Sequence, residues 1–170
     1  MSIIKMNNDK ILYPEGVHDV VLSAVYSLGL QPGFQDEQPK SKHVYVFELA
    51  EKIPDGTLAG QPYIISGTYT DSLNEKSRLT EVIRALKGGL TAQEMQSGFD
   101  NESLIGLNCK IVTVNKTNAG KTTATIVSFL KRDSSTPLLT PTFDRSKVPT
   151  WVKRLQDQRL DKPKSTDNAA

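Results

Sequence analysis

Apolar and polar side chains alternate along much of the chain between residues 16 and 132, and this alternation predicts β-strands. The alternating segments are rich in branched and aromatic residues and are bounded by turn-forming residues. We expect strands at 16–31, 43–53, 62–73, 107–116 and 121–132. The first segment is long for a strand and apolar on both faces, which is typical of a strand that curls and serves two packing surfaces.

Between the third and fourth strands the spacing becomes helical. Four aliphatic residues recur at i, i+3, i+4 and i+7, namely Leu79, Val82, Ile83 and Leu86. We expect a helix over 74–89, with Asn74 as its N-cap and Gly88 at its end. Thr91 followed by Glu94 is a capping-box pattern and predicts a further turn or two of helix.

The last forty or so residues read as a tail. From 133 to 170 the chain has four prolines among Ser, Thr, Lys and Asp, and it offers little apolar surface to offset the cost of ordering it. One island has apolar residues at helical spacing and predicts a short amphipathic helix near 149–160, which must dock on something or fray. We therefore divide the chain into a domain at 1–132, with its core from about residue 14, and a C-terminal tail at 133–170.

Three strands, one helix and two further strands define the fold class. That order is typical of a five-stranded Greek-key barrel of the oligonucleotide/oligosaccharide-binding (OB) type, in which the helix closes one end. A small β-sandwich fits less well because of the mid-chain helix. A βαβ arrangement does not fit, because only one helix separates the strand groups.

Composition restricts the cellular compartment in which we expect the protein. No stretch approaches the ~20 consecutive apolar residues of a membrane helix, and the N-terminus lacks the pattern of a signal peptide. The single cysteine, Cys109, can form neither an intramolecular disulfide nor a cysteine-based metal cluster. We expect a cytoplasmic protein, in the host cell if the chain is viral, with no membrane contact.

Charge is distributed unevenly. Residues 1–100 hold nine Lys or Arg against 13 Asp or Glu, whereas residues 101–170 hold 12 against six. The overall charge of +2 therefore hides an acidic first part and a basic last part. A basic region indicates a polyanionic partner, although a solvated surface of mixed charge is the simpler reading.

Catalytic and metal-binding patterns are absent. His18 and His43 lie in strands with no zinc or metalloprotease spacing around them, and a structural role is the simpler reading of both. Cys109 sits in an apolar strand with no base nominated nearby. We therefore expect no enzyme activity, no metal and no cofactor.

Binding chemistry has more support. Tyr45, Phe47 and Tyr69 lie on the second and third strands, where an OB-type barrel usually binds, and are candidates for stacking on bases. Candidate phosphate-binding residues lie near the loops that rim that groove, namely Lys40, Lys42, Lys116, Lys121, Lys131 and Arg132. The alternative readings are core rings and lysines that protect strand edges.

The second strand poses a problem of coverage. Tyr45 and Phe47 share one face, while Val44 and Val46 share the other. Both faces can be buried only if something covers the outer one. The candidates are nucleic acid, a partner subunit, or the tail helix around Trp151.

The stretch 69–129 resembles a group of tailed-bacteriophage and prophage proteins, and the resemblance extends back to residue 16, over about 115 residues. Two motifs carry it. The strand-to-helix motif matches at Tyr69, Ser72, Lys76 and Ser77, and the second motif matches at Phe99, Leu104 and Gly106. Members of this family are regarded as single-stranded-DNA-binding proteins of the barrel fold, associated with phage replication or recombination.

The resemblance implies the same fold and function for this chain, but with two departures. Many relatives have an aromatic-Arg-Gly where this chain has Leu86-Lys87-Gly88. Bacterial single-strand binders typically end in an acidic tip that recruits replication enzymes, whereas this chain ends in KPKSTDNAA. If it recruits replication or recombination proteins, the tail helix is the candidate surface, through Trp151 and Leu155.

We therefore expect a sequence-nonspecific single-stranded-DNA-binding protein of a phage or prophage that is not an enzyme. The alternative is a protein-interaction or virion-assembly module on the same barrel, in which the tail helix is the working part. An enzyme, such as a nuclease accessory, would need a carboxylate pair, and Asp19, Glu48 and Asp71 are too scattered in sequence to nominate one. Oligomeric state, including a homo-oligomer, and the choice between DNA and RNA stay open at this stage.

Overall fold

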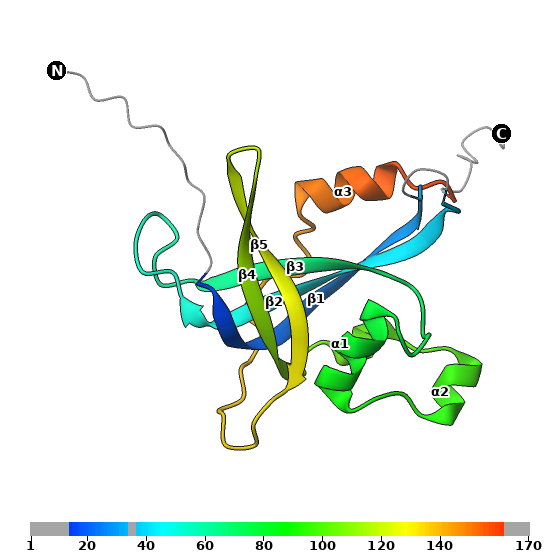
Figure 1. Cartoon of the computed structure of the whole chain (residues 1–170), viewed down its shortest axis with the longest axis horizontal. Helices are drawn as coiled ribbons and strands as arrows, with labels where there is room; N and C mark the ends of the chain where they lie inside the picture. The colour runs from blue at the N-terminus through cyan, green and yellow to red at the C-terminus, as the bar shows by residue number, and fades with distance from the viewer. Residues whose placement is uncertain (1–13, 34–36, 162–170) are drawn as a thin grey trace.

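The computed structural model describes residues 14–33 and 37–161, and it is mainly β with a few short helices (Figure 1). The five expected strands are present with slightly different ends, as β1 Gly16–Gln31, β2 Lys40–Lys52, β3 Pro62–Thr70, β4 Asn108–Asn118 and β5 Lys121–Lys131. The helices are α1 Arg78–Lys87, α2 Ala92–Ser97, the 3-10 helix η1 Asn101–Leu104 and α3 Thr150–Asp157.

One antiparallel sheet contains all five strands, in the order β3-β2-β1-β4-β5. The central strand β1 pairs with β4 through residues 16–21 and with β2 through residues 20–31. The β1–β2 register shifts between Leu22 and Ala24 and between Ser27 and Gly29, and such bulges bend a strand and increase its twist. Among the described residues, β3 and β5 are not paired with each other, so the sheet is curled but open.

The inner face of the sheet holds the larger of two apolar cores. The two edge strands meet across it, because the rings of Tyr69 in β3 and Phe129 in β5 have centroids 5.9 Å apart. Helix α1 closes this face with the four aliphatic residues that the spacing singled out, all of them buried. The helical pattern of 74–89 is thereby confirmed, with the stripe facing the core.

The ends of α1 differ in part from the prediction. The N-cap is Ser77, not Asn74, because the hydroxyl oxygen of Ser77 accepts a backbone N–H of the first turn at 3.2 Å. At the other end Gly88 has a φ of 88°, a left-handed conformation that glycine adopts without strain. The capping box of Thr91 and Glu94 is confirmed at the start of α2.

A second, smaller core lies on the outer face of β1 and β2, and the C-terminal segment covers it. Val152 of α3 is fully buried there against residues of both strands, namely Ala24, Tyr26, Leu28, Val44 and Val46. Nucleic acid, a partner subunit and the tail helix were the candidates to cover this face, and in the described structure the tail helix covers it. Residues 133–161 carry little regular structure apart from α3, yet they pack on the sheet.

A buried carboxylate fastens the start of this segment. Glu48 of β2 is 3% exposed and accepts hydrogen bonds from the backbone N–H and the hydroxyl of Thr142, at 2.8 and 2.7 Å. It also accepts the N–H of Phe143 and, at 2.8 Å, the hydroxyl of Ser23. Burial raises the pKa of Glu48, but these hydrogen bonds together lower it by more, so its pKa lies below the ordinary value.

Two further side chains hold the same segment by its backbone. The side-chain amide of Asn108 in β4 both donates to the carbonyl of Leu139, at 3.1 Å, and accepts its N–H, at 2.8 Å. The hydroxyl of Tyr26 donates to the carbonyl of Arg145 at 2.8 Å. The path of the segment across the sheet is therefore set by polar contacts as well as by apolar burial.

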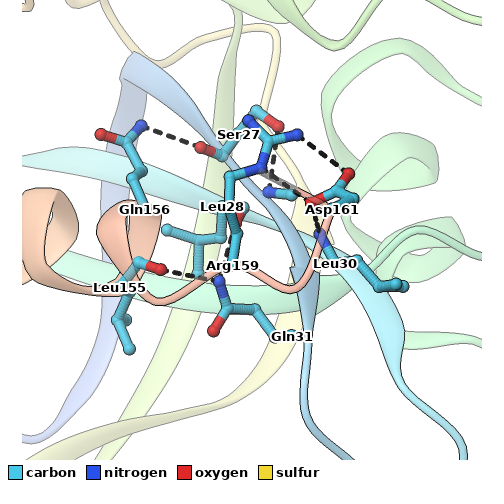
Figure 2. Close-up of polar contacts among 9 residues, drawn as sticks. Ser27, Leu28, Leu30, Gln31, Leu155, Gln156, Arg159 and Asp161 are labelled. Atoms are coloured by element: carbon cyan, nitrogen blue, oxygen red, sulfur yellow. Dashed lines mark hydrogen bonds and ion pairs between the residues drawn. The ribbon is translucent and has the colours of Figure 1, made fainter. Parts of the chain in front are cut away.

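The end of α3 is joined to the end of β1, as Figure 2 shows. The amide of Gln31 donates to the carbonyl of Leu155 at 2.8 Å. The backbone of Leu30 accepts the N–H of Leu160 at 2.8 Å and donates to the carboxylate of Asp161 at 2.9 Å. This extends the cover along the outer face up to the β1–β2 end of the sheet.

Candidate nucleic-acid interface

The three predicted stacking rings lie in the inner core. Tyr45 and Phe47 are 0% exposed and Tyr69 is 6% exposed. The centroids of Tyr45 and Tyr69 are 5.5 Å apart with their planes nearly perpendicular, an edge-to-face packing common in protein interiors. The prediction that these rings stack on bases is wrong for the folded chain, because the curl of the sheet and α1 close over them.

The hydroxyl of Tyr45 shows how complete this burial is. It donates to the side-chain oxygen of Asn101 in η1, so even the polar end of the ring is engaged within the protein. Burial is the largest cause that raises the pKa values of Tyr45 and Tyr69 well above those of a free tyrosine. Phe47 packs in turn against Phe129, with 5.9 Å between centroids.

The six predicted phosphate-binding residues fall in three places. Lys40 and Lys42 open β2 at the β1–β2 end of the sheet, and Lys116 and Lys121 flank the tip of the β4–β5 hairpin. Lys131 and Arg132 lie at the other end of β5, roughly 30 Å from that tip at ~3.3 Å per residue. The expectation that all six rim one groove is therefore wrong.

Strand alternation places the first four lysines on the outer face of the curled sheet, as two pairs at opposite ends of β1. Lys40 and Lys42 alternate with the inner-face side chains of β2 and share the outer face with Val44, which lies under α3. Lys116 and Lys121 point to the same outer face of the hairpin. Lys131 is paired with Cys109, a residue of the inner core, and so points to the opposite face.

The six predicted residues also differ from several other cations of the chain in their ion pairing. In residues 14–33 and 37–161, acidic partners engage Arg78, Lys87, Lys110 and Arg159 at 2.7–2.8 Å, but none of the six predicted residues. Arg132 donates one hydrogen bond to the carbonyl of Thr136 at 2.6 Å. No carboxylate of the described residues thus neutralises the six predicted phosphate-binding side chains.

The C-terminal segment adds cations that sequence reasoning did not assign to the site. Arg145, Lys147, Lys153 and Arg154 are exposed. Lys153 and Arg154 lie on the solvent side of α3, since its other side seats Val152. In Figure 1, α3 and the tip of the β4–β5 hairpin lie toward the same upper edge of the molecule. The signal was present in the sequence, as two cations flanked by the apolar positions of the tail helix.

The two predicted partner-binding residues contact the chain itself. Trp151 and Leu155 are partly buried and pack against the outer core of β1 and β2. The apolar side of α3 is therefore occupied within the folded chain, and the assignment of these two residues to a partner protein stays a prediction. Trp151 remains partly exposed, and the exposed cations Lys153 and Arg154 follow it closely in the sequence.

The inner rim of the sheet is acidic. A hollow of about 530 Å³ lies between β1, the start of β2, the β3–α1 connection and η1, and Asp71, Asp100 and Glu102 line it. His43 shares a 2.6 Å hydrogen bond with Asp71 there. This side of the molecule would repel a polyanion, whereas the outer face carries the unpaired lysines.

Carboxylates and histidines do not gather into a reactive centre. No group of three or more His, Cys, Asp or Glu that could hold a metal occurs in the part of the chain that the structure describes. His18 is buried between the carboxylate of Glu51, at 2.5 Å, and the carbonyl of Pro14, at 2.6 Å. Burial also raises the pKa of the Cys109 thiol to about 12.

No known family model matches the sequence, and no curated protein matches it. Within the described residues, no helix is both long and apolar enough to cross a membrane.

Proposed function

We propose that the sheet is an open barrel of the OB type. The central strand β1 pairs with both β2 and β4, and the main helix α1 lies between β3 and β4 in the chain. The contact between rings of the two edge strands supports a sheet that curls toward closure. These are features expected of a five-stranded Greek-key barrel.

We further propose that the chain binds single-stranded DNA without sequence preference, in phage or prophage DNA replication or recombination within the host-cell cytoplasm. The family resemblance of residues 16–129 supports this class of function. The observation that carries the proposal is a set of four lysines on the outer face of the sheet that form no ion pair with any described residue, namely Lys40, Lys42, Lys116 and Lys121. The two pairs lie at opposite ends of β1, so each pair would neutralise phosphates at its own end of a DNA strand that crosses the outer face, and release their counterions.

The buried rings change the proposed mechanism. Affinity would come mainly from phosphate contacts, with Lys153 and Arg154 of α3 adding to those of the sheet. Trp151 is the partly exposed ring nearest to these cations in sequence, and it is the candidate for base stacking. Lys131 and Arg132 lie outside this interface, at the end of β5 remote from the hairpin tip.

Anisotropy of labelled oligo-dT at several salt concentrations tests the proposal. For the wild-type protein, the logarithm of the binding constant should fall linearly as the logarithm of the salt concentration rises. The double variants Lys40→Gln with Lys42→Gln and Lys116→Gln with Lys121→Gln should each make the slope shallower by about 1.4, at ~0.7 per phosphate on a single strand. Oligo-dA should weaken by the same factor as oligo-dT, because phosphate contacts carry no sequence information.

The matched control is the double variant Lys131→Gln with Arg132→Gln, which removes the same charge from the end of β5 remote from the hairpin tip. It should leave oligo-dT affinity within about twofold of wild type, since it removes only long-range charge. Affinity that ignores salt would overturn the proposal. Equal weakening by all three double variants would overturn the assignment to the outer face.

A further inference from the structure

A second hollow lies at the end of β5 remote from the tip of the β4–β5 hairpin. It has a volume of about 760 Å³ and lies between the C-terminal end of α1, the start of β4, the end of β5 and residues 138–141. We call it the α1–tail groove. Neither the proposed DNA binding nor the family resemblance assigns it a role.

Every charged side chain that lines the α1–tail groove is a cation. Lys87 is engaged by Glu94 at 2.8 Å, whereas Lys131 and Arg132 form no ion pair with any described residue. Arg132 donates to the carbonyl of Thr136, which holds the guanidinium in place and leaves further N–H donors. An anion that enters the groove therefore meets two cations without an ion-pair partner among the described residues, and no carboxylate among the residues that line the groove.

The rest of the lining is aliphatic. Leu86, Leu107 and Leu139 form its walls, and Leu138 stands 68% exposed beside them. The wall at Leu139 is fixed, because the amide of Asn108 binds its N–H and its carbonyl. A fixed groove loses little conformational freedom when it binds a ligand.

We propose that the α1–tail groove binds an acidic, apolar peptide segment of a partner protein. Carboxylates of the segment would pair with Lys131 and Arg132, and its aliphatic or aromatic side chains would pack between Leu86, Leu138 and Leu139. A nucleic acid fits less well, because no aromatic ring lines the groove to stack on bases and its free cations are confined to the end of β5.

Anisotropy of a short fluorescein-labelled peptide, with equal numbers of aspartate and leucine, tests this on the full chain. Two comparison peptides replace every aspartate by asparagine or every leucine by serine. Only the acidic, apolar peptide should bind well, because the groove offers both cations and leucines. Unlabelled oligo-dT should not displace it.

Variants locate the peptide. Lys131→Gln with Arg132→Gln should weaken binding about tenfold, by loss of two charge-assisted contacts, and Leu138→Ser about threefold. Lys116→Gln with Lys121→Gln removes equal charge from the hairpin tip and should leave peptide affinity unchanged. All three variants change residues that are exposed or at strand ends, and thermal unfolding checks that each variant folds.

Several outcomes would overturn the proposal. These are no binding of the acidic, apolar peptide, equal binding of the serine-substituted peptide, and equal weakening by the hairpin-tip variant. Competition by oligo-dT that is lost in Lys131→Gln with Arg132→Gln would assign the groove to nucleic acid instead. Because the same two double variants exchange the roles of test and control, failure of this proposal is distinguishable from failure of DNA binding.

Discussion

The two faces of β1 and β2 are both buried, but in different ways. The inner face is sealed by rings and by α1, with Tyr45 and Phe47 fully enclosed. The outer face has a smaller core under α3, and its cover is fastened by hydrogen bonds to side chains of the sheet. Large apolar area dominates the first face, whereas directional polar contacts position the cover of the second.

The difference bears on where function can lie. A sealed aromatic core stabilises the fold but offers no ring to a ligand. The cover of the outer face adds exposed cations, Lys153 and Arg154, beside a face that already presents four unpaired lysines. The outer face thus has both a structural layer and a charged surface, and it is the side on which we propose that DNA binds.

The largest expected effect is on the inner face. Phe47→Ala should reduce the free energy of unfolding by about 3–5 kcal/mol, because it leaves a cavity among Tyr45, Phe129 and their neighbours. Urea unfolding followed by circular dichroism measures this. Phe47→Leu keeps most of the volume and should cost less. A loss below ~1 kcal/mol for Phe47→Ala would mean that the rings are not the main core.

An intermediate effect is expected at the fastening of the outer cover. Glu48→Gln should cost about 1–3 kcal/mol in the free energy of unfolding, since an amide cannot accept all the donors that Thr142, Phe143 and Ser23 direct at the carboxylate. Chemical denaturation at pH 7 measures the difference from wild type. Thr142→Ser retains both donors and serves as the matched control.

The difference in stability between wild type and Glu48→Gln should depend on pH in a definite direction. The pKa of Glu48 is lower in the folded state than its ordinary value of 4.5, so the ionised group stabilises the fold above pH 4.5. That stabilisation is lost as the pH falls through the folded-state pKa. The advantage of wild type over Glu48→Gln should therefore shrink on acidification, and an advantage that grew would contradict the assigned hydrogen bonds.

The smallest effect is expected at the end of the cover. Gln31→Ala removes the donor to the carbonyl of Leu155 and should cost about 1 kcal/mol. Amide hydrogen exchange should show the loss mainly in α3, with the inner core unchanged, because local opening draws on the less stable parts of a fold. Lys153→Ala, on the exposed side of α3, should leave exchange unaltered. Equal acceleration in α1 would mean that the two faces unfold as one unit.

Local pattern predicted the elements well. Alternation located all five strands, and the aliphatic stripe of 74–89 located α1, because backbone period and side-chain burial are coupled within a single element. The N-cap was misplaced by three residues, since Asn74 and Ser77 are both good capping residues and only the hydrogen bond to the first turn distinguishes them. The candidate interface was predicted less well, because it depends on which face each strand presents and on what covers it.

The sequence alone determined three features of the protein. These are the order of strands and helices, the amphipathic tail helix, and the apolar character of both faces of β2. Only the tertiary structure decided that Tyr45, Phe47 and Tyr69 are sealed inside, that Trp151 and Leu155 contact the chain's own sheet, and that Lys131 and Arg132 lie apart from the other lysines. Alternation along a strand separates two faces but does not say which is covered. That depends on contacts between residues far apart in the chain, such as Glu48 with Thr142, 94 positions away.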